Sequence, residues 1–231
     1  MEMYKRLKAA YHKIFKEQRK YKIDYKYLRG CKKILDIGSG KGYFIENNPV
    51  AITGIDYNEK SIGESLSKGH KVIKASALHL PFKDAAFDGI HCAHLIEHFE
   101  LDDVKKIISE IYRVLKPSGI LVLRTPMYNK YFFNDPTHIR PYPPSAIMNL
   151  LGLIDYGQSS LVENLKITFR FVKLKIFRGN LFQPIYEVSV APRQFPCAVI
   201  FKSIGLLLAQ FNIKSFGYSD YLIVLSKCVT K

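Results

Sequence analysis

The stretch ILDIGSGKGYF, residues 34–44, joins a short apolar run to a turn that has three glycines in five positions. Glycines after a first strand let the backbone approach a ligand and open the following helix toward it. A dinucleotide-binding turn reads G-x-G-x-x-G/A, but Tyr43 stands where the third small residue belongs. A P-loop needs Gly-Lys followed by Ser or Thr, and here Gly42 follows. Both phosphate-binding interpretations are therefore weakened.

Two acidic residues indicate another ligand. Asp36 directly precedes the glycines, where an anion repels phosphate and suits a cationic amine. Asp56 ends the next apolar run, 18 residues after Gly38, at the place where an acid binds both hydroxyls of a ribose. A ribose, an amine and no phosphate together describe S-adenosylmethionine (SAM).

Strand-like and helix-like segments alternate along the chain. We expect helices to begin at residue 41 and to cover residues 58–69, 102–119 and 144–152, the third capped by Asp102 and ended by Pro117 and Gly119. Strands separated by helices predict a parallel sheet with right-handed crossovers. The expected strands are 33–38, 51–57, 70–76, 87–93, 119–126, 165–177 and 219–227.

Length and composition are those of one globular α/β domain: 231 residues, of which 48% are hydrophobic and 24% charged. The four cysteines form no CxxC pair, which argues against a zinc knuckle or a disulfide scaffold and favours a reducing cytoplasm. No apolar run reaches the length of about 18 residues typical of a membrane span. We therefore expect a cytoplasmic protein, with peripheral membrane contact left open.

The net charge of +15 is concentrated at the two ends of the chain. Residues 1–30, expected to form a basic amphipathic helical segment, and residues 161–231 each hold 10 Lys or Arg against 3 acids. Basic flanks favour RNA, lipid headgroups or a phosphorylated substrate as partners, although a basic soluble surface has the same composition. Residues 195–211 are apolar around most of a helix, which suits packing on the sheet or membrane contact.

Several motifs in order make the chain similar to the class I SAM-dependent methyltransferases, in particular the type-11-like methyltransferase domain. The matching stretches are ILDIGSGKGYF, GIDYNEKSI, LPFKDAAFDGIHCAHLIEHF, VLKPSGILVLRTP and NDPTHIRPY. The resemblance implies a methyltransferase domain over 31–231, with its core at 33–152 and a divergent region at 153–231. It also implies a Rossmann-like α/β fold: a seven-stranded sheet in the order 3-2-1-4-5-7-6, strand 7 antiparallel, with helices on both faces.

The resemblance also assigns cofactor-binding residues. Asp56 maps to the ribose acid and Tyr57 to the residue that lines the adenine, while Cys92, Ala93 and His94 flank the cofactor. The family often has Asp before the LPF segment, and this chain has Ser76, Ala77 and Leu78 there, so its grip on adenine is less certain than its grip on ribose. The residues assigned to the methionine end are Asp36, Gly38, Ser39, Gly40 and Gly42.

Candidate catalytic groups lie in HLIEHF and DPTHIRPY. Methyl transfer is an in-line displacement, so the protein mainly positions the acceptor, and a base assists where the acceptor must lose a proton. We expect Glu97, His98 and His138 to serve in this way, with helix capping and loop shaping as the structural alternatives. His94, Glu97, His98 and His138 could instead bind a divalent ion, but we assign no metal ligands.

Aromatic residues dominate the segment after the fifth expected strand. Tyr128, Tyr131, Arg140 and Tyr142 are expected to bind the acceptor as a lid, with ordinary loop packing as the alternative. The sequence thus predicts a SAM-dependent methyltransferase, acting on an oxygen of a small-molecule, glycan or lipid-linked acceptor. The alternatives are an RNA methyltransferase and a non-catalytic scaffold or regulatory protein that binds the cofactor.

Overall fold

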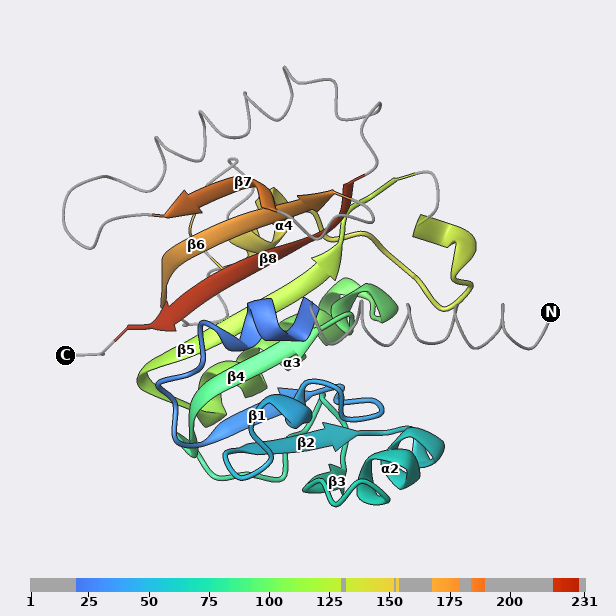
Figure 1. Cartoon of the computed structure of the whole chain (residues 1–231). Coiled ribbons are helices and arrows are strands. Elements are labelled where there is room, and N and C mark those ends of the chain that lie inside the picture. Colours follow the sequence, from blue (N-terminus) through green and yellow to red (C-terminus); the bar gives the residue numbers. More distant parts are fainter. Residues whose placement is uncertain are drawn as a thin grey trace.

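One mixed sheet organises the molecule (Figure 1), for which we use a computed structural model. The described residues are 20–129, 132–151, 153, 168–178, 184–189 and 218–228. The helices are α2 (Glu59–Leu66), α3 (Leu101–Val114) and α4 (Pro144–Leu150), with 3-10 turns η1 (Ile45–Asn47), η2 (Ile96–His98) and η3 (Phe132–Asn134). The strands are β1 (Ile34–Ile37), β2 (Ile52–Asp56), β3 (Val72–Lys74), β4 (Phe87–Ala93), β5 (Leu115–Pro126), β6 (Phe169–Arg178), β7 (Pro184–Ser189) and β8 (Tyr218–Lys227).

The strand order is β3-β2-β1-β4-β5-β8-β6-β7. Strands β1 to β5 pair in parallel, and β8 lies antiparallel between β5 and β6. The expected order 3-2-1-4-5-7-6 is confirmed, with β8 in the place of the seventh strand. The sequence did not predict β7, which pairs antiparallel with β6 and adds an eighth strand at the edge.

Apolar side chains pack on both faces of the sheet because alternate residues of a strand point to opposite sides. In β5, Leu121 and Leu123 belong to the larger core, which α3 and α4 cover. Val122 belongs to the smaller core on the other face, together with Leu28 and Phe44. Both faces are thus covered, as the resemblance implied.

All four expected helices are shorter than expected, and for two of them a proline explains the difference. Helix α3 has Glu100 rather than Asp102 as its N-cap and ends at Val114. Residues that precede a proline avoid helical angles, so Pro117 ends the helix early and Leu115 already begins β5. The helix expected from residue 41 is reduced to η1, which ends at Asn47, with Asn48 as its C-cap directly before Pro49.

The structure describes residues 20–30 of the expected N-terminal helical segment: residues 20–25 are helical, whereas residues 26–30 form turns. The remainder of that helix, up to residue 19, and the apolar helix expected over 195–211 lie outside the described residues. Within the described part of the chain, every helix is too short or too polar to cross a bilayer.

Candidate functional site

A pocket of about 280 Å³ lies at the carboxyl ends of β1, β2 and β3. Ligands of open parallel sheets bind at this edge. Five of the predicted cofactor residues meet here, from three separate loops of the sequence. The lining residues are Gly38, Ile55, Asp56, Tyr57, Ala75, Ser76, Ala77, Leu95 and Phe99.

The glycine turn after β1 is fastened to the end of β2. The N–H groups of Gly38 and Ser39 donate to the carbonyl of Ile55 at 3.0 and 2.9 Å. Gly42 has φ +78°, and a Cβ added there would lie 2.3 Å from Nδ1 of His70. Only glycine fits at that position. Of the residues in this turn, Gly38 lines the pocket, and the contacts of Gly40 and Gly42 with SAM stay predictions.

Asp56 closes the pocket on the β2 side. Its Oδ2 accepts from the N–H of Gly40 at 2.7 Å, and its Oδ1 accepts from the N–H of Asn58 at 2.8 Å. Each carboxylate oxygen has a second lone pair. The carboxylate is therefore held in place with lone pairs left to accept, and its contact with the ribose hydroxyls stays a prediction.

The predicted adenine side of the pocket is apolar and open. Tyr57 is 75% exposed at its rim, while Ser76 and Ala77 line its wall. The N–H of Leu78 donates to Oγ of Ser76 at 3.2 Å, which leaves the serine hydroxyl proton for another acceptor. The Leu78 side chain packs against the larger core, so only its backbone can serve the site.

Other predicted cofactor residues are not among those that line the pocket. Cys92 is fully buried in the larger core, burial raises the pKa of its thiol, and Cys92 and Ala93 end β4 rather than follow it. A Cβ on Gly54 would lie 2.6 Å from Oγ of Ser39, so this hydroxyl packs on the sheet. Asp36 is 2% exposed and binds His91. For these residues the assigned contacts with SAM stay predictions.

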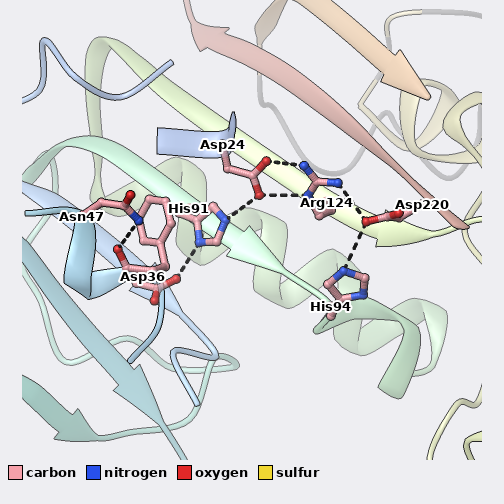
Figure 2. Close-up of polar contacts among 8 residues, drawn as sticks. Asp24, Asp36, Asn47, His91, His94, Arg124 and Asp220 are labelled. Carbon is pink, nitrogen blue, oxygen red and sulfur yellow. Dashed lines mark hydrogen bonds and ion pairs between the residues drawn. The ribbon is translucent and has the colours of Figure 1, made fainter. Parts of the chain in front are cut away.

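A chain of buried ionic groups crosses the sheet beside the pocket (Figure 2). Nδ1 of His91 bonds Oδ1 of Asp36 at 2.7 Å, and Nε2 bonds Oδ2 of Asp24 at 3.2 Å. Arg124, also fully buried, donates to both oxygens of Asp24 and to Oδ2 of Asp220. The chain thereby ties the N-terminal segment to β4, β5 and β8.

Burial and ion pairing compete in this chain of groups. Burial alone raises the pKa of Asp24, but the guanidinium of Arg124 outweighs it, so that pKa lies below its ordinary value. Burial alone lowers the pKa of His91, but the charges of Asp36 and Asp24 outweigh it, so that pKa lies above its ordinary value. The pKa of Asp220 is lowered, despite burial, by His94 and Arg124. Opposite charges are therefore retained inside the protein.

The residues Asp24, Arg124 and Asp220 were missed in the sequence. The only signal was Arg124 within the mainly apolar strand GILVLRTP and Asp220 near the start of SDYLIVLSK, a strand that also ends in Lys227. A strand that is buried on both faces admits a charge only when a partner neutralises it. That rule shows that partners exist, but it does not identify them.

His94 and Glu97 lie where β4 leaves the sheet. His94 has φ 52°, a left-handed conformation that is uncommon outside glycine and concentrates at functional sites. Its Nδ1 lies 3.4 Å from Oε1 of Glu97 and its Nε2 lies 3.6 Å from Oδ2 of Asp220. Burial raises the pKa of Glu97, but contact with His94 outweighs it, so this pKa is lowered and the buried carboxyl is ionised.

The structure brings the rings of His98 and His138 together, and the catalytic role assigned to them stays a prediction. Their ring centroids lie 5.0 Å apart. The loop that carries His138 is fastened to η2, because the N–H of Ile139 donates to the carbonyl of Glu97 at 2.9 Å. Leu95 and Phe99 line the pocket on either side of Glu97 and His98 in the sequence, so the three candidate catalytic residues adjoin the cofactor site.

The expected acceptor lid is supported only in part. Tyr128 is 63% exposed and Arg140 is exposed, as a binding role requires, while Tyr131 lies outside the described residues. For Tyr142 the prediction is wrong: the side chain is 2% exposed in the larger core, and its hydroxyl donates to the carbonyl of Phe99 at 2.9 Å. The prolines around it suggested a loop, and the ring nevertheless packs into the larger core.

The pocket suits an adenosine better than a phosphate. It presents a fixed carboxylate, a glycine backbone and apolar walls from Ala75, Ala77 and Phe99. A carboxylate accepts from ribose hydroxyls and repels phosphate, while apolar walls suit a base. The residues present therefore fit SAM, with Asp56 on the ribose.

The sheet order with antiparallel β8, and a pocket of this kind at its carboxyl edge, define an α/β methyltransferase fold. A solved structure of a SAM-dependent methyltransferase from Archaeoglobus fulgidus is similar in fold, with a TM-score of 0.62, 24% identity, and coverage of 91% of this chain and 92% of that one. Residues 35–123 match the family model described as a methyltransferase domain. Residues 35–123 are therefore a methyltransferase domain of the class I SAM-dependent type, for which SAM is the cofactor.

Curated relatives cover part of the chain. It is 33% identical over 124 residues to a sterol 24-C-methyltransferase of Pneumocystis carinii, which is 48% of this chain and 32% of that protein. It is 36% identical over 92 residues to a probable tRNA methyltransferase 9B of Bos taurus, which is 39% of this chain and 20% of that protein. The chain thus spans a third or less of these relatives, and the similarity resides in the methyltransferase domain.

Proposed function

We propose that this chain transfers the methyl group of SAM to an oxygen atom of a small-molecule, glycan or lipid-linked acceptor in the cytoplasm. The observation that carries the proposal is the adjacency of two groups of residues. The pocket holds Asp56 in place for a ribose. Beside it, two histidines and a buried carboxylate converge, as deprotonation of an acceptor hydroxyl requires.

The reaction assigns each group one task. The bond between sulfur and the methyl carbon breaks as the bond from the acceptor oxygen to that carbon forms, and S-adenosylhomocysteine leaves with both electrons of the broken bond. The acceptor hydroxyl gives its proton to His98 or His138. Neutral imidazole suits this step because its ordinary pKa is about 6.5. Glu97 stabilises the charge that the ring then carries.

The surface beside His138 favours an acceptor with an apolar or aromatic body. Three of the large exposed hydrophobic residues, Tyr128, Phe133 and Ile139, lie within this one loop. The rings of Phe132 and Phe133 meet edge to face at 4.9 Å. Aromatic side chains bind rings and apolar chains through large contact areas, which supports a ring-bearing or lipid-linked acceptor.

An RNA acceptor is the second candidate. The charge of +15 favours nucleic acid, and the similarity to a probable tRNA methyltransferase 9B points the same way. Against this candidate, the basic residues are divided between the two flanks and form no recognisable RNA-binding module.

A non-catalytic scaffold is the third candidate. A protein that binds SAM without turnover would keep Asp56 and the glycine turn, and it needs none of the histidines.

A methyl-transfer assay with labelled SAM separates these candidates. Purified protein is incubated with cell extract that has been fractionated into lipid, small-molecule, RNA and protein pools, and each pool is counted. We expect label in the lipid or small-molecule pool, reduced at least tenfold in His98→Ala and His138→Ala. Label confined to RNA would select the second candidate, and binding of S-adenosylhomocysteine without any transfer would select the scaffold.

A further inference from the structure

We propose that Glu97, His98 and His138 bind a divalent first-row transition-metal ion such as Zn²⁺ or Mn²⁺. One oxygen of Glu97 and one ring nitrogen of each histidine all lie within 4.8 Å of one another. The three residues come from η2 and from the loop after β5, which are joined by the hydrogen bond between Ile139 and Glu97. Two imidazoles with one carboxylate are a ligand set that such ions prefer.

The hydrogen bonds of both rings leave one nitrogen ready to bind an ion. Nδ1 of His138 lies 2.7 Å from the carbonyl oxygen of Phe132, and Nδ1 of His98 lies 3.0 Å from that of Thr137. A carbonyl only accepts, so each Nδ1 carries the proton. In the neutral ring Nε2 then holds a free lone pair, which is the arrangement of metal-binding histidines.

Asp135 supports His98 through Thr137. The Thr137 hydroxyl donates to Oδ1 of Asp135 at 2.6 Å, so its oxygen can only accept from Nδ1 of His98, at 3.0 Å. Oδ2 of Asp135 lies 3.9 Å from Nε2 of His138, too far for a hydrogen bond. The lone pair of that nitrogen stays available.

Glu97 supplies the observation that points to a ligand. The residue is 0% exposed, and its Oε2 accepts from the hydroxyl of Thr125 at 3.2 Å. Oε1 has no hydrogen-bond partner among the described residues, since its contact with His94 at 3.4 Å lacks hydrogen-bond geometry. A buried carboxylate oxygen that accepts no hydrogen bond is costly, and His94 is its only ion-pair contact among the described residues. A cation would complete the neutralisation of this oxygen.

The three ligand atoms of Glu97, His98 and His138 lie slightly farther apart than they would around a bound ion. Metal–nitrogen and metal–oxygen distances of about 2.0–2.2 Å hold two ligand atoms no more than about 4.4 Å apart. The set therefore closes by less than about 0.5 Å on binding, which rotation of the partly exposed His138 can supply. Because two of the three ligands are nitrogens, the site favours Zn²⁺ or Mn²⁺ over Mg²⁺.

A catalytic role for the ion rests on the proposed function, whereas the binding of the ion to Glu97, His98 and His138 does not. Three protein ligands leave at least one coordination position open toward the acceptor. An acceptor hydroxyl in that position would lose its proton to water more easily, because the ion stabilises the oxyanion. The same three residues would then act through the ion rather than as bases.

Calorimetric titration of the untagged, chelator-treated full chain with Zn²⁺, Mn²⁺ and Mg²⁺ tests the proposal. We expect one Zn²⁺ or Mn²⁺ per chain, at least tenfold weaker binding in His98→Ala and His138→Ala, and unchanged binding in His79→Ala, where the residue is an exposed histidine elsewhere. Visible absorption of the Co²⁺ form provides a second measurement, since histidine ligands alter its spectrum. Glu97→Gln is a third variant, checked for folding by circular dichroism because the side chain is buried.

The outcomes are distinct. Lack of Zn²⁺ and Mn²⁺ binding, or equal binding by wild type and both histidine variants, would overturn the site. Titration with S-adenosylhomocysteine is run in parallel on the same proteins. If the protein binds S-adenosylhomocysteine but no metal ion, the metal site is refuted and the proposed function stands. If it binds a metal ion but no S-adenosylhomocysteine, the proposed function is refuted and the metal site stands.

Discussion

Asp56 and Gly40 are joined by a hydrogen bond of 2.7 Å from the Gly40 N–H to Oδ2 of the carboxylate. This side-chain bond joins the end of β2 to the turn after β1, and it adds to the backbone hydrogen bonds from Gly38 and Ser39 to the carbonyl of Ile55. The acid that is expected to bind the ribose thus also fixes the turn that approaches the methionine end. Both halves of the cofactor site depend on one side chain.

Asp56→Ala should therefore weaken S-adenosylhomocysteine binding by at least about 100-fold. Two hydrogen bonds to a charged acceptor contribute about 1.5 kcal/mol or more each, and the turn loses its support as well. Calorimetry measures the change. Asp102→Ala, which removes a highly exposed carboxylate on α3, is the matched control and should bind like wild type. Equal binding by the Asp56 variant would refute the ribose assignment.

Gly42→Ala and Gly63→Ala should have opposite effects on stability. At Gly42 the new Cβ would overlap the His70 ring and the Ser65 hydroxyl at a φ of +78°, so we expect a loss of about 2 kcal/mol or more. Gly63 lies within α2 with open space around it, so alanine should stabilise the helix by about 0.5–1 kcal/mol. Urea unfolding followed by circular dichroism compares the two. A neutral Gly42 variant would contradict the packing of the turn.

The sequence predicted those parts of the fold and site that local patterns encode. The glycine turn, Asp56 and the strand at 87–93 follow from spacing, and the structure contains all three. Long-range pairing is not encoded locally: Arg124 meets Asp24 across 100 residues and Asp220 across 96. Nor does residue type reveal burial in a loop, so Tyr142 was assigned to the lid although it belongs to the core.

Arg124→Met should lower the free energy of unfolding by about 3–5 kcal/mol. Removing one partner of a buried pair leaves Asp24 and Asp220 charged and buried without compensation. Arg113→Met removes a guanidinium that is 31% exposed in its pairs with Asp84 and Glu110, and it should cost about 1 kcal/mol or less. Urea titration of both variants gives the difference. Similar losses in the two variants would show that the buried network contributes no more than a surface pair.

The buried His91 should make stability depend on pH. Its folded pKa lies above the ordinary value because Asp36 and Asp24 favour the charged ring, and that ring stacks on Phe44 at 3.7 Å. The resulting stability is fully present below the unfolded pKa of about 6.5 and is lost as pH rises through the folded pKa, at up to about 1.4 kcal/mol per pH unit.

His91→Gln should lack this dependence, since glutamine keeps hydrogen bonding but does not titrate. Thermal or urea unfolding between pH 5 and 9 therefore should show the difference between wild type and variant shrinking as pH rises above about 6.5. A difference that stays constant or grows over this range would mean that the buried ring is neutral in the folded protein.

Tyr128 and Tyr142 should separate binding from folding. Tyr128 is exposed beside Phe132 and Phe133, so Tyr128→Ala should raise the KM for an apolar acceptor several-fold and leave the melting temperature nearly unchanged. Tyr142→Phe removes a buried hydroxyl bond to Phe99 and should cost about 1 kcal/mol of stability with KM unchanged. Unfolding and steady-state kinetics on both variants make the comparison. Each tyrosine is the control for the other. A raised KM in Tyr142→Phe alone would mean that Tyr142 contacts the acceptor and that Tyr128 does not.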